Sequence, residues 1–395
     1  MDMKNLVSLY NLDSYEDSNV KLAVESSFCK FNLDKIIKPD MKVLLKVCLP
    51  YSVLPDSAET SHPAIVQGVV EVLSDMGAKC IIADSPYKNY TQSYLDSVYF
   101  KTGMLEVANS SDCELNHNLK TFSIDTPNGV QTKSLTLLDA LNDVDVIINL
   151  GKIKLDENLG YLGSSANLFG LLPGEMKTLV LNRMNTIEDF NNYIIDIVDA
   201  LKDKLIFNII DGVVAIEAGN SQRMLSCLAM SEDTFSLDSA IIKILGLNYE
   251  NTIIKLASER GFIDIENPFE TIGEDLDKFR LDDFALYDYD LNTQIHKNKR
   301  AQKSYFYSHQ ERPTIKPNKC KGCAVCSKIC PTNAIMMKYD KNGELYAEID
   351  YKKCIFCKKC YLECPYKVVK MKTPLAYKKL HKDINRFNKE NTESK

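Results

Sequence analysis

Apolar positions over the first 310 residues follow two alternating patterns: short unbroken runs, and longer stretches with helical spacing. Residues 42–47 (KVLLKV) form a run typical of a buried strand. Residues 63–76 place apolar side chains on one helical face between Pro63 and Gly77, and residues 79–84 form the next predicted strand. This alternation predicts an α/β domain with a mostly parallel sheet.

The same pattern continues further along the chain. Residues 143–150 and 205–211 are predicted strands, and residues 190–204 and 238–247 are predicted helices. Residues 160–177 are rich in turn formers and poorly periodic, so we expect a binding loop there.

Ligands of such folds lie beyond the carboxyl ends of the parallel strands. The residues that follow the predicted strands are Asp84, Ser85, Asn149 to Lys154, Asp211 and Gly212. An Asp in this place also commonly caps the following turn, and that interpretation stays open.

Several function classes lack support in the sequence. Neither GxGxxG nor GxxxxGK[ST] occurs, so nothing indicates a dinucleotide site or a P-loop. The amino terminus has no apolar signal region, and no run of about 18 uncharged apolar residues predicts a membrane span. We therefore expect a cytoplasmic protein.

Eight of the 13 cysteines lie in two short runs, CKGCAVCSKICP at residues 320–331 and CIFCKKCYLECP at residues 354–365. In a long cytoplasmic chain thiols stay reduced, so metal binding is a better interpretation than disulfides. Structural zinc sites normally use separated C-x2-C pairs. Each run here instead has four closely spaced cysteines followed by a proline, which fits a zinc site poorly. The remaining cysteines are isolated, and each is expected to be a small buried hydrophobic residue: Cys29, Cys48, Cys80, Cys113 and Cys227.

The two runs share the spacing C-x2-C-x2-C-x3-C-P, which resembles the bacterial-type 2×4Fe-4S ferredoxins. The resemblance covers residues 313–373 and implies a small α+β domain with two 4Fe-4S clusters. It also implies that the fourth cysteine of each run binds the cluster of the other run. The implied ligands are Cys320, Cys323, Cys326 and Cys364 for cluster 1, and Cys354, Cys357, Cys360 and Cys330 for cluster 2.

Charge divides the chain in the same place. Residues 313–395 contain 19 Lys and Arg against 8 Asp and Glu, a net charge of +11, so the first 312 residues carry −17 of the total of −6. Two bound clusters with eight thiolates would remove about four positive charges from the basic end. A redox partner protein or a small-molecule electron acceptor is therefore expected, and nucleic acid is not.

Residues 5–290 resemble a second family, that of domain of unknown function 362. The resemblance rests on SHPAIVQGVVEVLSDMGAKCIIADSP, DVDVIINLGKIK, SANLFGLLPGEMK, IIDGVVAIE and SEDTFSLDSAIIKILGL, in this order. It implies an α/β fold but no known reaction. The family's Lys-Pro-Asn after the first strand stands here as Lys46, Val47 and Cys48.

Positions that match the polar motifs of this family are the candidate substrate-binding residues: Lys46, His62, Asp84, Lys152, Lys154, Asn167 and Asp211. The three lysines are expected to form a carboxylate or anion site at the strand ends, unless they are simply solvated. His62 precedes a predicted helix start, where it is either a ligand or base, or a local packing residue.

Together these patterns predict four segments: an α/β domain at residues 1–291, a linker at 292–312, the ferredoxin domain at 313–373 and a basic amphipathic tail at 374–395. The expected function is single-electron transfer to or from an N-terminal domain that binds a small anionic substrate. Three alternatives stay open: an iron-sulfur oxidoreductase, an electron carrier with no catalytic site of its own, and a redox-sensing regulator.

Overall fold

The structure is a computed structural model that describes residues 5–16, 19–87, 90–295, 312–330, 333–351, 353–354 and 359–372. The chain forms two compact units, which divide between Ile295 and His296. The predicted tail and most of the predicted linker lie outside the described residues. The predicted limits of the four segments stay predictions.

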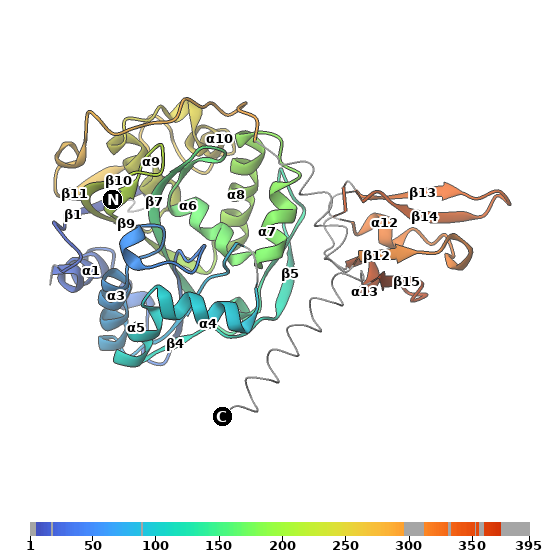
Figure 1. Ribbon diagram of the computed structural model, residues 1–395, viewed down its shortest axis with the longest axis horizontal. Coiled ribbons are helices and arrows are strands. Elements are labelled where there is room, and N and C mark those ends of the chain that lie inside the picture. Colours follow the sequence, from blue (N-terminus) through green and yellow to red (C-terminus); the bar gives the residue numbers. More distant parts are fainter. Residues whose placement is uncertain are drawn as a thin grey trace. The chain divides into compact units, whose positions relative to one another are not determined.

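A large, mostly parallel sheet forms the centre of the N-terminal unit (Figure 1). Only β10 and the short β8 run antiparallel to their neighbours, which confirms the predicted fold class. In spatial order the strands are β11 (Glu270–Gly273), β1 (Leu6–Asn11), β10 (Gln222–Ser231), β9 (Leu205–Ile216), β7 (Val146–Asp156), β2 (Lys42–Lys46), β3 (Lys79–Ala83) and β4 (Cys113–Leu115), with β8 (Gly160–Leu162) paired to β7.

Helices cover both faces of this sheet because its central strands are apolar on both sides. Along β2, Val43 and Leu45 enter one hydrophobic core, and Leu44 between them enters the other. On the first face lie α1 (Asn19–Lys30), α2 (Leu33–Ile36), α3 (Pro63–Asp75), α4 (Gln92–Lys101) and α5 (Met104–Ser110). On the second lie α6 (Ser164–Asn167), α7 (Gly174–Leu181), α8 (Ile187–Leu201), α9 (Thr234–Ile244) and α10 (Ile253–Glu259). A separate hairpin of β5 (Thr121–Asp125) and β6 (Ser134–Leu138) completes the unit.

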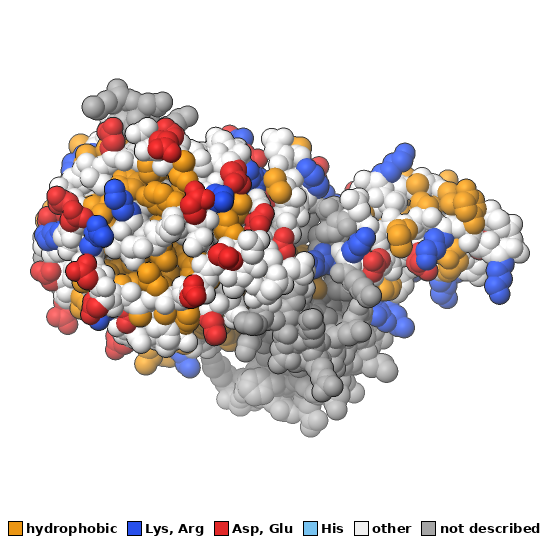
Figure 2. Space-filling model, turned by 90° about the horizontal axis from the view of Figure 1, so that it is seen from above, with side chains coloured by type: hydrophobic (Ala, Val, Ile, Leu, Met, Phe, Trp, Pro, Cys, Tyr) orange, Lys and Arg blue, Asp and Glu red, His pale blue; other side chains and the backbone are white. Residues whose placement is uncertain are grey.

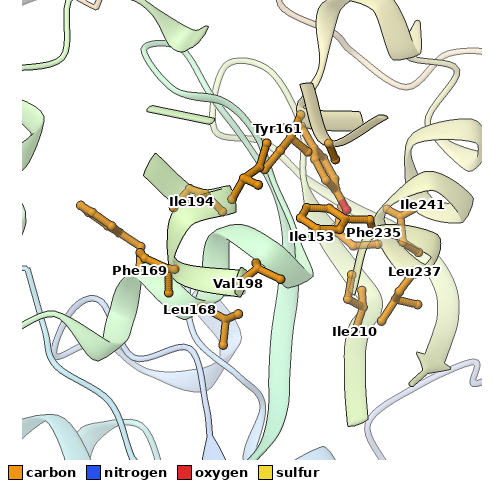
Figure 3. Packing of buried hydrophobic residues seen from close by; sticks show 14 of the residues in the cluster. Ile153, Tyr161, Leu168, Phe169, Ile194, Val198, Ile210, Phe235, Leu237 and Ile241 are labelled. Carbon is orange, nitrogen blue, oxygen red and sulfur yellow. The ribbon is translucent and has the colours of Figure 1, made fainter. Parts of the chain in front are cut away.

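The second face carries the larger of the two cores, part of which is seen in Figure 3. Ile194 and Val198 of α8 lie one helical turn apart, so they share one face of the helix, and both are buried in this core together with Ile153 and Ile210 of the sheet. Thr186 begins α8 with a capping box, in which its hydroxyl accepts from the backbone N–H of Asp189. A fixed start of this kind holds the helix in register over the sheet.

Several predicted elements differ in extent from the structure. The strand expected at 205–211 continues to Ile216, and the one expected at 143–150 runs from Val146 to Asp156. The helix expected at 238–247 begins earlier, at Thr234, because the Asp233 side chain caps it. The prediction of a loop at 160–177 is wrong. Most of this segment is occupied by short elements: β8, α6, a 3-10 turn at Leu168–Leu171 and the first half of α7.

The C-terminal unit is small and consists of short elements: β12 (Arg312–Ile315), α12 (Val325–Lys328), β13 (Ile335–Tyr339), β14 (Leu345–Ile349), α13 (Lys359–Leu362) and β15 (Val369–Lys372). Strands β13 and β14 form an antiparallel hairpin, whose turn ends at Gly343 with φ +78°. Strand β12 pairs with β15, so the first of these strands is joined to the last. Figure 2 shows Lys and Arg side chains spread over this unit, as its excess of basic residues requires.

No helix among the described residues is long and apolar enough to cross a bilayer.

Candidate functional site

A pocket in the N-terminal unit contains much of the predicted site. It lies where β2 and β3 end and where β7 passes them, as expected for a largely parallel sheet. The residues that line it are Cys48, Pro50, Asp84, Tyr87, Lys152, Lys154, Leu162, Gly163, Ala166, Asn167, Phe169, Gly170, Lys177 and Phe190. Of the seven candidate residues, Asp84, Lys152, Lys154 and Asn167 line the pocket, and Lys46, His62 and Asp211 lie directly behind them.

The end of β2 and the residue after β3 meet in a buried ion pair. Lys46 Nζ lies 3.0 Å from Asp84 Oδ1, and neither side chain is appreciably exposed. Asp84 also accepts from the backbone N–H groups of Leu49 and Ser85. A Cβ on Gly170 would lie 2.1 Å from Asp84 Oδ1, so only glycine lets the chain pass this close to the pair. The charge of Lys46 is therefore already compensated and is not available to a ligand.

A second buried ion pair joins β7 to β9. Lys152 Nζ lies 3.0 Å from Asp211 Oδ2 and 2.8 Å from the hydroxyl oxygen of Tyr15, to which it donates. Tyr15 in turn donates to Asp211 Oδ1 at 3.0 Å. Burial lowers the pKa of Lys152, and the neighbouring Asp211 opposes this shift. Burial, reinforced by Asp211, raises the pKa of Tyr15 far above its ordinary value, so the phenol stays protonated.

His62 lies at the edge of this network and begins α3. Its Nδ1 accepts from the backbone N–H of Ala64 at 3.3 Å, which makes it the N-cap residue, and Pro63 follows at the first helical position. The imidazole stacks on the Tyr15 ring with the centroids 3.6 Å apart. Burial lowers the pKa of His62 to about 4, so the ring is neutral at physiological pH. Of the two interpretations of His62, these contacts match that of a local helix-start residue.

The remaining two lysines differ from each other in their partners. Lys154 Nζ donates to the backbone carbonyl of Glu59 and lies 3.7 Å from its carboxylate. Lys177 is 2% exposed, donates to the backbone carbonyl of Ser85, and places its ammonium 5.3 Å from the centre of the Tyr87 ring. Burial lowers the pKa of Lys177 to about 8. Among the described residues, no carboxylate lies within ion-pair distance of Lys177.

Helix α6, which lines the pocket, is held in place by hydrogen bonds to buried amide side chains and to one buried carboxylate. Asn167 Nδ2 donates to Asn149 Oδ1 at 2.8 Å, and its Oδ1 accepts from Lys46. Asp238 accepts from the backbone N–H groups of Ser164 and Ser165 at 2.7 and 2.9 Å, at the start of α6. Asp238 is therefore an anchor for this segment.

Sequence reasoning missed four residues of this site. Tyr15 lies in an N-terminal stretch without a motif, and Tyr87 follows a strand as an isolated residue. Cys48 and Cys29 were expected to be small buried hydrophobic residues, and this is wrong for both: Cys48 is half-buried and lines the pocket, and Cys29 is exposed. Lys177 had a signal, because it is the last residue of the segment SANLFGLLPGEMK. Its helical setting one turn into α7 could not be seen in a segment expected to be a loop.

The cysteines of the C-terminal unit form a second site. Cys320, Cys323, Cys326 and Cys364 all line one pocket, although Cys364 belongs to the other run. Burial raises the pKa of Cys326 to about 11, and the charges of Cys320 and Cys323 add to this shift. For Cys364 burial also raises the pKa, but hydrogen bonds from the backbone of residues 366–369 outweigh it and leave the pKa below its ordinary value.

Three of the other four cysteines are described. Cys354 and Cys360 are buried in the core of this unit, and the half-buried Cys330 packs against the same core. Cys330 Sγ accepts from the backbone N–H of Ala334 at 3.2 Å. Cys357 lies outside the described residues.

The described thiols suit an iron-sulfur cube in number and type of ligand. Within the described ranges, no group of three or more His, Cys, Asp or Glu side chains is arranged to hold a single metal ion. A cube separates its ligands more widely, because each thiolate binds a different iron atom. Backbone N–H groups directed at Cys364 and Cys330 are the hydrogen bonds that stabilise thiolate sulfur.

Comparison with known proteins assigns both units. Residues 43–243 match the family model described as domain of unknown function (DUF362), which is half of the chain. The chain belongs to this family. Residues 319–368 match the model of a 4Fe-4S dicluster domain, so this family member carries an iron-sulfur domain after its family domain.

Individual relatives agree with these two assignments. A thylakoid-associated protein of Synechocystis sp. is 27% identical over 267 residues, which are 65% of this chain and 80% of the relative. The iron-sulfur component of a putative dimethyl sulfoxide reductase from Halobacterium salinarum is 42% identical over 55 residues, 13% of this chain and 20% of the relative. The chain thus spans only a fifth of this second protein. An uncharacterised ferredoxin of Methanocaldococcus jannaschii is 36% identical over 62 residues, 15% of this chain and 78% of the relative.

Among solved structures, the lactate racemase apoprotein from Thermoanaerobacterium thermosaccharolyticum aligns at 15% identity with a TM-score of 0.34. The alignment covers 58% of this chain and 54% of that one. A likeness this weak carries no argument about ligand or reaction.

Proposed function

We propose that this protein transfers single electrons through two 4Fe-4S clusters in its C-terminal unit. The observation that carries the proposal is the lining of one pocket by three thiols of the first cysteine run and the last thiol of the second. In this proposal Cys320, Cys323, Cys326 and Cys364 hold cluster 1. Cys354, Cys357, Cys360 and Cys330 hold cluster 2.

The clusters would supply reversible one-electron chemistry, with one protein thiolate on each iron atom in addition to the inorganic sulfide of the cube. The chain's own contribution is to bind and tune them. Backbone N–H groups around Cys364 donate to its sulfur and stabilise the thiolate form, which is the form that binds iron. The basic surface of the unit favours an acidic redox partner protein, and a small-molecule acceptor is the other candidate.

The N-terminal pocket is, in this proposal, the site of a small anionic substrate. The structure changes the residues that we assign to it. Lys46 and Lys152 are compensated by fully buried carboxylates. Lys154 has only the partly exposed Glu59 carboxylate at 3.7 Å, and Lys177 has no carboxylate within ion-pair distance among the described residues, so Lys177 is the cation best placed to meet an anion. The cytoplasmic location expected from the sequence remains part of the proposal, because 13 cysteines and an iron-sulfur domain suit a reducing compartment.

Anaerobic purification with iron and sulfide determination tests the electron-transfer proposal. We expect about eight irons per chain and two low-potential one-electron signals in a redox titration followed by electron paramagnetic resonance. Cys364→Ser should impair the cluster built on Cys320, Cys323 and Cys326. The matched control is Cys29→Ser, which changes an exposed, isolated thiol and should leave both signals intact.

Two results would contradict this proposal. A colourless, iron-free protein that contains zinc would refute electron transfer. Damage in Cys364→Ser that is confined to the cluster of the second run would refute the exchanged ligation.

A further inference from the structure

Around the N-terminal pocket there is one more lysine than there are carboxylate partners. Four lysines surround it, and three have a carboxylate partner: Lys46 with Asp84, Lys152 with Asp211, and Lys154 with Glu59. Lys177 alone among these four has no carboxylate partner in the described part of the chain. Its buried ammonium donates to a backbone carbonyl and lies over the face of the Tyr87 ring. The Asp84 carboxylate also acts on it, but from beyond ion-pair distance and already paired with Lys46. A buried cation without a counter-ion is costly, and a bound anion would remove that cost.

The walls of the pocket are largely apolar. Leu162, Phe169 and Phe190 come from β8, the 3-10 turn after α6, and the first turn of α8, and Tyr87 and Pro50 follow strands β3 and β2. Aromatic side chains give a flat organic group a large contact area, whereas a small inorganic ion gains nothing from them. The ligand must therefore combine a single negative charge with an apolar body.

Cys48 places a thiol in the same pocket. It is partly exposed and follows strand β2, and its charge when ionised would act on both Lys152 and Lys177. A bound molecule that reaches Lys177 would share the pocket with Cys48. The thiol thus reports whether the pocket is filled.

From these observations we propose that the pocket binds an apolar or aromatic monocarboxylate, with its carboxylate on the Lys177 ammonium and its body against Tyr87, Phe169 and Phe190. This inference deepens the proposed anion site and rests on that part of the proposed function. Lys177 is the specificity-determining residue, because it supplies the one uncompensated charge. Lys46 and Lys152, which the sequence suggested, serve to hold the strand ends together.

Alkylation of Cys48 by N-ethylmaleimide in the holoprotein, followed by mass spectrometry of its peptides, tests this inference. We use benzoate as the probe and the neutral benzamide and inorganic phosphate as comparisons. Benzoate should slow the modification of Cys48 at least tenfold at saturation, whereas benzamide and phosphate at the same concentration should not. Cys29, which is exposed on α1, provides an internal control whose modification rate stays constant.

Lys177→Met removes the charge and keeps an unbranched side chain. We expect about tenfold or more benzoate to be needed for half-protection, as for the loss of one charge-assisted hydrogen bond. The matched control is Lys204→Met, since Lys204 also donates to backbone carbonyls, those of Leu141 and Val144, but lies outside the pocket. Its benzoate dependence should equal that of the unmodified protein.

The inference is overturned if benzoate gives no protection, if benzamide or phosphate protects as well as benzoate does, or if Lys177→Met keeps the original benzoate dependence. If Lys177→Met does not fold, the contrast between benzoate and benzamide on the unmodified protein still decides. Iron content measured on the same preparation separates the two proposals. Protection in an iron-free protein would refute electron transfer alone, and an iron-loaded protein without protection would refute the pocket alone.

Discussion

The two units of this protein bury reactive groups in opposite ways. In the N-terminal unit each buried pair of charges is internally neutral, as with Lys152 and Asp211 or Arg260 and Asp196. In the C-terminal unit the core consists of Ala334, Ile335, Ala347, Ile349, Val369 and four thiols, Cys326, Cys354, Cys360 and Cys364. The buried reactive groups there are thiols, and the apolar part of the core is small.

This difference shows where the stability of each unit must come from. The N-terminal unit is stabilised by two extensive hydrophobic cores, one on each face of the sheet. A region of about 60 residues with so few buried aliphatic side chains cannot reach comparable stability from apolar burial alone. Iron ligation would provide the remainder, because metal binding to a site absent in the unfolded chain is also folding free energy.

Removal of iron should have the largest effect and should separate the two units. In protein depleted of iron, we expect amide hydrogen exchange in residues 312–372 to lose its protection while β2, β3, β7 and β9 keep theirs. Mass spectrometry of the exchanged peptides measures both regions in one sample. Full protection of β13 and β14 without iron would show that the small core is sufficient by itself.

Breaking a buried pair in the N-terminal unit should come next in size. Asp211→Ala leaves the ammonium of Lys152 buried without its counter-ion, and we expect a loss of about 3–5 kcal/mol in the free energy of unfolding. Urea denaturation measures this loss. The control is Asp40→Ala, whose partner Lys79 is exposed, and it should cost no more than about 1 kcal/mol. Equal effects of the two changes would mean that burial does not distinguish these pairs.

The smallest effect should be a pH dependence from His62. Its pKa is about 4 in the folded protein against an ordinary value of 6.5, so between these values the unfolded chain binds a proton that the folded chain does not. The stabilisation is present above pH 6.5 and is lost as the pH falls towards 4. Because the ring is only partly buried, we expect a loss of about 1–2 kcal/mol.

Protonation also removes the lone pair on Nδ1 with which His62 caps α3. His62→Asn keeps a capping side chain without the titration, so its stability should vary less between pH 4 and 6.5. Denaturation series at several pH values give the comparison, and identical slopes in the two proteins would contradict the assigned pKa.

The sequence was informative to a different degree in the two units. The eight clustered cysteines carry their chemistry in local spacing, so the site could be predicted without any knowledge of the fold. The strands and helices of the N-terminal unit could also be predicted, because apolar periodicity is a local property. The ends of these elements were harder to predict. Strand β9 continues past Asp211 to Ile216, and most residues before and after Asp211 in this strand are buried.

The partners of charged residues could not be predicted. Lys46 and Asp84 are 38 positions apart, and Tyr15 and Asp211 are 196 apart, so only the folded sheet brings them together. For this reason Lys46, Lys152 and Lys154 were interpreted as one anion site, although the first two neutralise buried carboxylates. Lys177 was overlooked because the segment around it lacks helical periodicity in the sequence and nevertheless folds into short helices.

The position of β1 has a consequence for synthesis on the ribosome. This first strand, Leu6–Asn11, pairs with residues 227–230 of β10 and with β11, so it has no partner until most of the unit has been translated. Strands β2, β3 and β7 are complete much earlier and can assemble without it. The first strand to be synthesised is therefore among the last to enter the sheet. Tyr15, which follows this strand closely in the sequence, forms its hydrogen bond to Asp211 correspondingly late in folding.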